Sequence, residues 1–429
     1  MILLIIICLL TIVGIIASII FFPELTFKKI RLDTFWVISL IGALLIISFG
    51  LIDYSLVWSN LTSESEINPI KILFLFLSMA LLSIYLDELG FFKKLAIWAH
   101  ERAKANQIAI FLSFYFVISL LTIFTSNDII ILTFTPFIIN FAKKAKINPL
   151  PYLISEFIAA NTWSNMLIIG NPTNIYLATS FNVNFIDYFK IMFFPTIISG
   201  FVSLGLSLLL FRKELKKPIK KENSEKIIIG RGLLIIGLIH LFGCTGLLTV
   251  ASYLKLPMWL ISFGFALSLI ITTFIYQILK KDKTKIINKA LKRLPWNLVP
   301  FVLSMFIIVL SLNTYHITHA LNKVLNDNPY FYGFSAFFLA NILNNIPMSV
   351  MFAEILKGSS NINLVLFPTI IASNIGAYLT PIGALAGIMW MNILKKEEVK
   401  LSFLSFTKKT AFIALITMAV SLTIFLKII

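Results

Sequence analysis

Long apolar stretches, each of membrane-spanning length, recur along the whole sequence and alternate with short polar segments. Apolar and polar residues do not alternate at a period of two within them, which excludes a transmembrane β-barrel. The pattern predicts an all-α polytopic membrane protein with about 10–11 spans. Uninterrupted helices are expected at 2–22, 33–56, 70–89, 187–211, 229–250, 257–279, 296–314 and 407–428.

Four more apolar stretches contain polar interruptions. Two of them, 107–142 and 331–357, have a short polar tip, and we expect a re-entrant hairpin in each. The other two, 150–178 and 364–393, contain Gly and Pro within the apolar run, and we expect broken helices there. Backbone groups freed inside a bilayer are costly unless they are paired or line a cavity. The interruptions therefore mark segments suited to binding a ligand.

The two halves of the sequence have the same order of predicted elements. Each half, 1–211 and 229–429, has three helices, a hairpin, a broken helix and a final helix, and the basic linker 212–228 joins the halves. An odd number of crossings precedes the second half, so the second half enters the membrane from the opposite side. This arrangement is an inverted-topology repeat, which is common in secondary transporters.

Short sequence motifs within the broken helices support an internal duplication. One offset of 213 residues aligns Asn161 with Asn374 and Gly170 with Gly383. The hairpin tips match at a slightly different offset, SND (126–128) against LNN (343–345). We therefore expect four polar breaks, two from each half, to meet near the middle of the membrane.

The composition agrees with a membrane protein. Hydrophobic residues make up 59% of the chain, and the mean hydropathy is +0.95. The net charge of +17 comes from Lys and Arg in short loops, so it indicates cytoplasmic loops and contact with acidic lipids rather than nucleic acid binding. This charge distribution orients the first hairpin from the cytoplasm, the second from outside, and both termini outside. We expect a multi-pass protein of the cell membrane.

The sequence lacks the common signatures of enzymes. It has no nucleotide P-loop, no HExxH zinc motif and no GxSxG elbow. We therefore expect no enzyme activity and no cofactor, and transport would be driven by an ion gradient or by a separate ATPase subunit.

The interruptions favour binding of an anion or a polarised oxyacid. The N-terminal end of a half-helix carries partial positive charge and free N–H donors, while amide and hydroxyl side chains add neutral partners. Asp128 is the one carboxylate within an interruption, and an acid at membrane depth is functional by default. It could bind Na⁺, carry a proton or cap the following helix. Glu156, early in the first broken helix, is a second candidate for coupling.

Three segments resemble the arsenite/antimonite efflux permeases of the ion transporter superfamily. FTSNDIIILTFTPFI (124–138) is similar to their first hairpin, NNIPMS (344–349) to the second hairpin tip, and SNIGAYLTPIGALAGIMW (373–390) to the second broken helix. GNPTNIYLA (170–178) departs from the arsenite-permease pattern and looks more like anion-carrying relatives. By element order the resemblance covers nearly the whole chain.

The resemblance implies a secondary active transporter that works by alternating access. The first expectation is an arsenite/antimonite-type oxyanion permease driven by H⁺ or Na⁺. The alternatives are a Na⁺-coupled symporter of succinate, citrate or another anion, and a Na⁺/H⁺ antiporter. Relatives in the carboxylate branch are dimers, which implies a homodimer.

The candidate site residues follow from the resemblance and the aligned breaks. For substrate and ion binding they are Ser126, Asn127, Asp128, Asn161, Thr162, Gly170, Asn171, Thr173, Asn344, Asn345, Ser373, Asn374, Thr380 and Gly383. Coupling is expected at Asp128 and Glu156. A Na⁺ ion would be bound by Asn127, Asp128, Asn344 and Asn345.

Overall fold

The computed structural model describes the chain except for residues 23, 28–29, 64–67, 103–105, 220–229, 252–253 and 283. The described part is helical apart from one small antiparallel pair of strands, β1 (Glu24–Phe27) and β2 (Ile30–Asp33). Residues 220–228 of the predicted basic linker lie outside the described residues. The prediction of an all-α polytopic fold is confirmed.

The helices of the first half are α1 (Ile2–Phe21), α2 (Thr34–Ser48), α3 (Tyr54–Leu61), α4 (Pro69–Glu88), α5 (Phe91–Arg102), α6 (Gln107–Phe124), α7 (Asn127–Ala145), α8 (Leu150–Trp163), α9 (Pro172–Ser180) and α10 (Phe185–Phe211). The helices of the second half are α11 (Arg231–Val250), α12 (Met258–Lys280), α13 (Ile286–Arg293), α14 (Leu298–Thr314), α15 (Ile317–Leu325), α16 (Pro329–Leu343), α17 (Asn345–Leu356), α18 (Ile362–Ile375), α19 (Leu385–Lys396) and α20 (Phe403–Ile428).

Most helix boundaries lie close to the predicted ones, but the single helix expected at 33–56 is wrong. Instead, α2 ends at Ser48 and a separate α3 begins at Tyr54. Gly50 between them adopts a φ of 62°, a conformation that favours glycine, and the Asp53 side chain accepts a hydrogen bond from the Ser55 amide to cap α3. A left-handed turn followed by a capped start therefore divides the apolar stretch.

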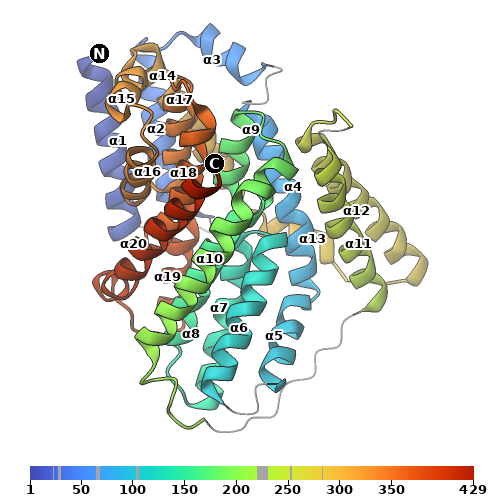
Figure 1. Cartoon of the computed structure of the whole chain (residues 1–429). Coiled ribbons are helices and arrows are strands. Elements are labelled where there is room, and N and C mark those ends of the chain that lie inside the picture. Colours follow the sequence, from blue (N-terminus) through green and yellow to red (C-terminus); the bar gives the residue numbers. More distant parts are fainter. Residues whose placement is uncertain are drawn as a thin grey trace.

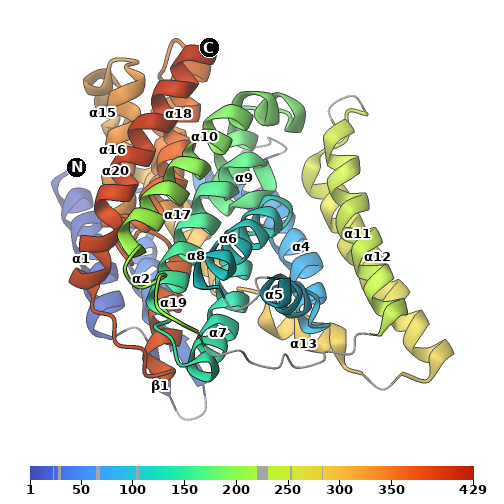
Figure 2. The same ribbon diagram turned by 60° about the horizontal axis from the view of Figure 1, so that its bottom comes forward.

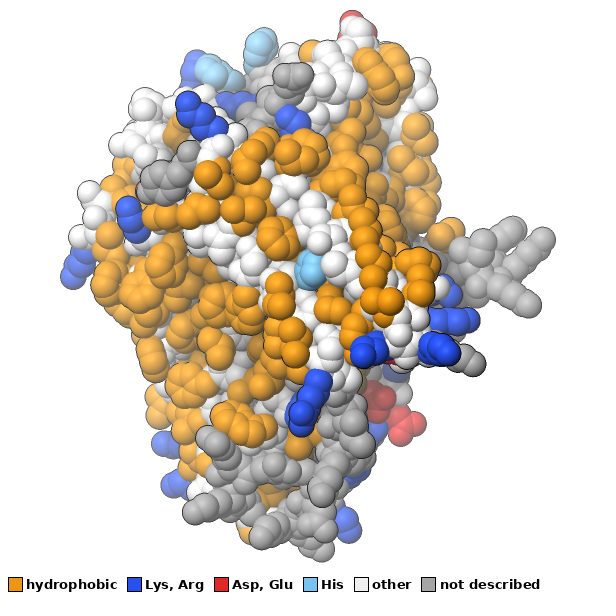
Figure 3. Space-filling model, turned by 90° about the vertical axis from the view of Figure 1, so that its right-hand side faces the viewer, with side chains coloured by type: hydrophobic (Ala, Val, Ile, Leu, Met, Phe, Trp, Pro, Cys, Tyr) orange, Lys and Arg blue, Asp and Glu red, His pale blue; other side chains and the backbone are white. Residues whose placement is uncertain are grey.

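Among the described residues, seven helical segments are long and apolar enough to cross a membrane. The helices of the second hairpin, α16 and α17, are shorter, with 15 and 12 residues, whereas a full crossing needs about 20. Figure 3 shows a face over α11 and α12 where hydrophobic side chains form a broad surface and Lys and Arg lie toward its edges. Such a surface is suited to contact with lipid.

The packing of the helices interleaves the two halves. In the first half, α4 packs against α11 and α12 of the second half, while α14 of the second half packs against α1 and α2. The long helices α10 and α20 pack against each other, and Figure 2 shows α11 and α12 side by side at one edge of the molecule. Figure 1 shows α6, α7 and α8 in the lower part of the molecule and α17 and α18 in the upper part. This arrangement is what two intertwined repeats of opposite orientation would give, although the repeat itself stays a prediction.

The first residues of the helices at the breaks show which positions of the two halves correspond in the structure. The helices that follow the breaks, α9 and α19, begin at Pro172 and Leu385, which are separated by the same offset of 213 residues as the sequence words. The helices α7 and α17 begin at Asn127 and Asn345. The N-cap residues of these helices, Ser126 and Asn344, are therefore equivalent positions. The sequence alignment of the hairpin tips, which matches Ser126 with Leu343, differs by one residue.

Candidate functional site

At the first break, between α8 and α9, the backbone of Gly170 packs too closely against Ser164 to leave room for a side chain. A Cβ atom at Gly170 would lie 2.3 Å from the carbonyl oxygen of Ser164. Asn171 then caps α9 by accepting a hydrogen bond from the Thr173 amide at 3.1 Å, and Pro172 takes the first helical position. The Gly-Asn-Pro word thus ends one half-helix and starts the next.

The second broken helix has a corresponding close contact. A Cβ atom at Gly387, in the first turn of α19, would lie 2.2 Å from the carbonyl oxygen of Pro381. Ala384 occupies the N-cap position of α19, and no side chain caps the helix there. The Gly387 N–H donates to the Ala384 carbonyl at 3.1 Å, which leaves the N–H groups of Leu385 and Ala386 for a ligand or water.

A replacement at Gly170 should be strongly destabilising. Gly170→Ala would place a methyl group against the Ser164 carbonyl, and such overpacking costs about 1–3 kcal/mol. We expect a lower apparent Tm for the purified full-length protein in detergent and a loss of transport. Gly205→Ala is the matched control, because a Cβ atom at Gly205 in α10 would have no atom within 4 Å. Equal stability of the two variants would contradict this explanation of the break.

Asn374 is the hub of the polar side chains at the first break. Its Oδ1 accepts hydrogen bonds from Ser164 Oγ at 2.7 Å and from Asn171 Nδ2 at 2.8 Å. Its Nδ2 donates to Asn174 Oδ1 at 2.6 Å. All four residues are buried. One amide of the second half therefore holds both sides of the break in the first half.

Hydroxyl groups extend this contact between the two broken helices. The hydroxyls of Thr173 and Ser373 lie 2.9 Å apart, and Thr162 Oγ1 lies 3.3 Å from the Tyr378 hydroxyl oxygen. We refer to Ser164, Asn171, Thr173, Asn174, Ser373 and Asn374 as the central cluster. It contains only uncharged donors and acceptors.

The second hairpin is fastened to the second break by Asn341. Its Oδ1 accepts hydrogen bonds from both the amide and the hydroxyl of Thr380, at 3.0 and 2.7 Å, and its Nδ2 donates to the Gly376 carbonyl at 2.9 Å. The Asn341 side chain therefore bonds a backbone amide and a backbone carbonyl that would be paired within a continuous helix.

The hairpin tip itself also contacts the second break through backbone groups. The Asn345 amide donates to the Gly383 carbonyl at 3.0 Å, and Asn344 Nδ2 donates to the Ile382 carbonyl at 3.2 Å. Asn345 Nδ2 lies at a long 3.4 Å from the Ser373 carbonyl, which connects the tip to the central cluster. The second hairpin and both broken helices thus form one connected polar region.

The first hairpin joins this region by one side-chain contact. Asn127 Nδ2 donates to Asn161 Oδ1 at 2.9 Å, and Asn161 Nδ2 donates to the Phe157 carbonyl one helical turn earlier. Ser126 is the N-cap of α7, but its side chain makes no cap hydrogen bond. Among the described residues, the Asp128 carboxylate in the first turn of α7 has neither a hydrogen-bond nor an ion-pair partner.

Two uncapped helix starts lie on the same side of the site. The helices α7 and α19 pack against each other, and their C-terminal ends are joined by an ion pair of 2.7 Å between Lys143 Nζ and Glu397 Oε2. They therefore run in parallel, with both N-termini directed toward the breaks, and neither start has a side-chain cap. Their partial positive charges favour an anion or a polarised oxygen.

Cavities beside the two breaks differ greatly in size. A cavity of about 720 Å³ is lined by buried Pro381 and by Ile382 of the second break, and the exposed Lys395 and Lys400 also border it. The space beside Thr173 at the first break is only about 20 Å³, roughly room for one water molecule. The second break therefore borders a large cavity, whereas the polar side chains Asn171, Thr173 and Asn174 of the first break are buried.

Glu156 lies away from the polar clusters. Its carboxylate is buried between α8 and α7, where Thr135 Oγ1 lies 3.1 and 3.2 Å from the two carboxylate oxygens. No ion pair to Glu156 occurs in the part of the chain that the structure describes. The structure thus separates the two acids proposed for coupling into different environments.

The structure brings together most of the predicted site residues. Of these, Asn171, Thr173, Ser373 and Asn374 belong to the central cluster, and Asn344, Asn345, Thr380 and Gly383 meet at the second hairpin. The candidate site residues did not include Asn174, which follows Thr173 directly, or Ser164 and Asn341. Ser164 and Asn341 each lie three residues along the chain from a predicted site residue, Asn161 and Asn344, and could have been found by that spacing.

Comparisons with known proteins agree with the motifs. The family model described as citrate transporter (CitMHS) matches residues 2–365. An arsenical pump membrane protein of Yersinia enterocolitica is 25% identical over 399 residues, covering 86% of this chain and 87% of the relative. One of Escherichia coli K12 is 25% identical over 391 residues, covering 85% and 86%.

A solved structure has a similar fold. The YdaH transporter of Alcanivorax borkumensis matches with a TM-score of 0.59 and 13% identity, covering 99% of this chain and 97% of that one. The resemblance to arsenite permeases and their superfamily is thereby confirmed. The family match covers most of the sequence, and the chain belongs to the citrate transporter family as a multi-pass membrane transporter.

Proposed function

We propose that this chain is a secondary active transporter of a small oxyanion of the arsenite/antimonite type, driven by an H⁺ or Na⁺ gradient. The observation that carries the proposal is the uncharged polar region at the crossing of the two broken helices. No Lys or Arg occurs in residues 125–128, 161–174, 341–349 or 373–387. Amides, hydroxyls and helix N-termini suit a small oxyacid whose charge is zero or low.

The size and charge of the substrate follow from the same groups. Arsenite is largely an uncharged trihydroxide at neutral pH, so its hydroxyls can both donate to and accept from Asn and Ser side chains. A site without a fixed cation stabilises such a molecule without the desolvation cost of a full charge. The relatives that cover most of the chain at about 25% identity carry the name arsenical pump membrane protein, which supports this substrate class.

Asp128 is proposed as the group that couples transport to the ion gradient. It lies in the first turn of α7 and has no partner among the described residues. A proton or a Na⁺ ion at this carboxylate would remove its negative charge beside the uncapped starts of α7 and α19 and allow an oxyanion to approach. Na⁺ would be bound by Asp128 together with Asn127, Asn344 and Asn345, while Glu156 would serve as a second, buried proton acceptor.

Alternating access is supported by the unequal cavities. The second break borders a cavity of about 720 Å³ on the side of Lys395 and Lys400, which the charge distribution assigns to the cytoplasm. At the first break, the polar side chains are buried and the pocket beside Thr173 has only about 20 Å³. If the two proposed inverted repeats, 1–211 and 229–429, exchanged conformations, the first break would open and the second would close. The site would then face the other side of the membrane.

A Na⁺-coupled carrier of citrate or a related carboxylate is the second candidate. The match to the citrate transporter family over residues 2–365 favours it. A citrate carrier, however, would have to neutralise several negative charges at a site without Lys or Arg, so bound cations would be required.

Growth in arsenite tests the proposed substrate. The full-length protein, produced in a bacterial host that lacks its own arsenite exporters, should raise the arsenite concentration that halts growth several-fold above the empty vector. An unchanged arsenite tolerance with verified membrane insertion, together with Na⁺-dependent citrate uptake by the same cells, would replace the first candidate by the second.

A further inference from the structure

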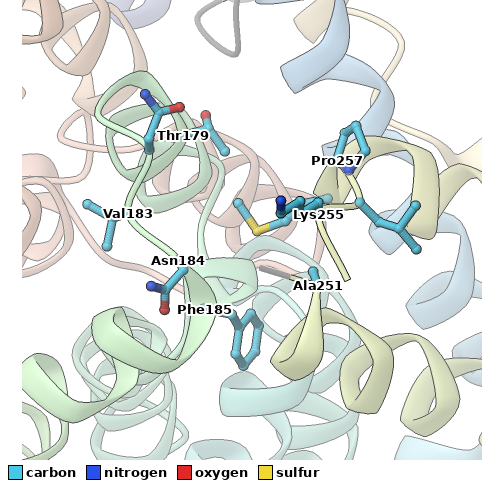
Figure 4. A pocket seen from close by; sticks show the side chains of 10 residues that line it. Thr179, Val183, Asn184, Phe185, Ala251, Lys255 and Pro257 are labelled. Atoms are coloured by element: carbon cyan, nitrogen blue, oxygen red, sulfur yellow. The ribbon is translucent and has the colours of Figure 1, made fainter. Parts of the chain in front are cut away.

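A second pocket lies on the opposite side of the molecule from the large cavity, at two neighbouring turns. It has a volume of about 240 Å³ and lies between the turn from α9 to α10 and the turn from α11 to α12. Figure 4 shows its lining, with Thr179, Asn184 and Phe185 on one side and Ala251, Lys255 and Pro257 on the other. Neither turn belongs to the site at the two breaks.

The described lining of the pocket carries one charged side chain, the exposed Lys255. Lys255 has no ion-pair partner among the described residues. Asn182 adds an amide group that makes no side-chain hydrogen bond among the described residues. Asn184 and Thr179 also line the pocket, but Asn184 Nδ2 donates to Asp187 and the Thr179 hydroxyl donates to the Ile175 carbonyl at 2.7 Å. The acid nearest in sequence, Asp187, is not part of the lining, and its carboxylate already accepts a hydrogen bond from the Asn184 side chain.

The helix start at the pocket adds to this character. Pro257 is the N-cap of the 23-residue helix α12 and offers no side-chain hydrogen bond, and Met258 of its first turn also lines the pocket. Free N–H groups at such a start favour negative charge. A lysine, the Asn182 amide and a helix start around a space of this size are groups that can bind a small anion.

The pocket is close to the first break. It includes Thr179 near the C-terminal end of α9, whose other end begins at the break, and a nine-residue helix is about 13 Å long. The segment 179–186 contains no Lys or Arg, which predicts that it lies outside the cell, and the turn from α11 to α12 lines the same pocket. An anion held there would lie one short helix away from the central cluster.

We propose that this pocket binds a small, fully charged oxyanion, such as a carboxylate or phosphate, at the outer surface of the protein. The binding is independent of the substrate proposed above, since uncharged arsenite gains little from a lysine. If the transported substrate is a carboxylate, the pocket binds it before it reaches the central cluster. If the substrate is arsenite, the pocket binds a different anion.

Protection of Lys255 from an amine-acylating reagent tests the proposal in the full-length purified protein. Citrate or inorganic phosphate should slow acylation of Lys255 at least about threefold at constant ionic strength, as mass spectrometry of the peptides would show. Lys323, which is exposed in α15 on the same predicted side, is the internal control and should be unaffected. Arsenite at neutral pH should protect neither.

A variant in the opposite turn separates the pocket from general charge effects. Asn182 has a φ of 54°, so Asn182→Gly removes the amide while keeping a backbone conformation that glycine adopts readily. It should raise the anion concentration needed for half-protection of Lys255 several-fold. Equal protection of Lys255 and Lys323, no protection by either anion, or protection unchanged in Asn182→Gly would overturn the proposal. None of these results depends on whether the protein transports arsenite.

Discussion

Asn374→Ala should unfold the centre of this transporter more readily than any other single amide replacement at the site. The truncation removes the partners of Ser164 Oγ, Asn171 Nδ2 and Asn174 Oδ1 in a buried region. Ser164 Oγ keeps its bond to the Asn161 carbonyl, so two buried groups are left unsatisfied. Each costs about 1–3 kcal/mol, so we expect a loss of about 2–6 kcal/mol and a large fall in apparent Tm. Thermal melts of the purified full-length protein in detergent measure the effect.

A milder variant distinguishes the role in transport from the role in stability. Ser373→Ala removes the contact with the Thr173 hydroxyl and should cost about 1 kcal/mol, yet it should lower the transport rate several-fold because the central cluster loses a ligand group. Asn60→Ala is the control, since Asn60 bonds only the backbone of its own short helix α3. If the Asn374→Ala and Asn60→Ala variants had the same apparent Tm, the hydrogen bonds of Asn374 would have no importance for stability.

Asp128→Asn should uncouple transport from the ion gradient while leaving the fold intact. The replacement keeps the size of the side chain, and no hydrogen bond or ion pair among the described residues depends on the carboxylate. It removes the charge that would bind a proton or Na⁺, so gradient-driven flux should fall at least about tenfold. Flux in proteoliposomes with and without an imposed gradient measures the change.

The matched control for this variant is Asp53→Asn. Asp53 caps α3 at an exposed position, and Asn is an equally good cap, so both stability and flux should stay at the wild-type level. Full gradient-driven flux in Asp128→Asn would eliminate Asp128 as the coupling group. The buried carboxylate of Glu156 would then be the next residue to replace.

The sequence predicted the breaks well because their chemistry is local. Gly170, Asn171 and Pro172 each act on their own backbone, as a close contact, a cap and a first helical residue. Asn161 and Asn374 are separated by 213 residues, as the predicted repeat requires, and the helix starts after the breaks, Pro172 and Leu385, have the same separation. Such features need no knowledge of the tertiary contacts.

Other features depend on contacts between distant segments and could not be read from the pattern. The bond between Asn374 and Ser164 joins residues of opposite halves, and Asn341 is defined as a site residue only by the backbone of the second break. The short helices α5, α13 and α15 lie in segments assigned to loops, since a polar, amphipathic stretch of this length has no strong signal of its own.

Transport by the purified full-length protein in proteoliposomes tests the proposed function most directly. Radiolabelled arsenite and citrate would be offered separately under an imposed pH gradient, an imposed Na⁺ gradient and no gradient. We expect arsenite flux that requires one of the gradients, stops when an ionophore dissipates it, and is lost in Asp128→Asn. Na⁺-driven citrate uptake without any gradient-dependent arsenite flux would contradict the proposal.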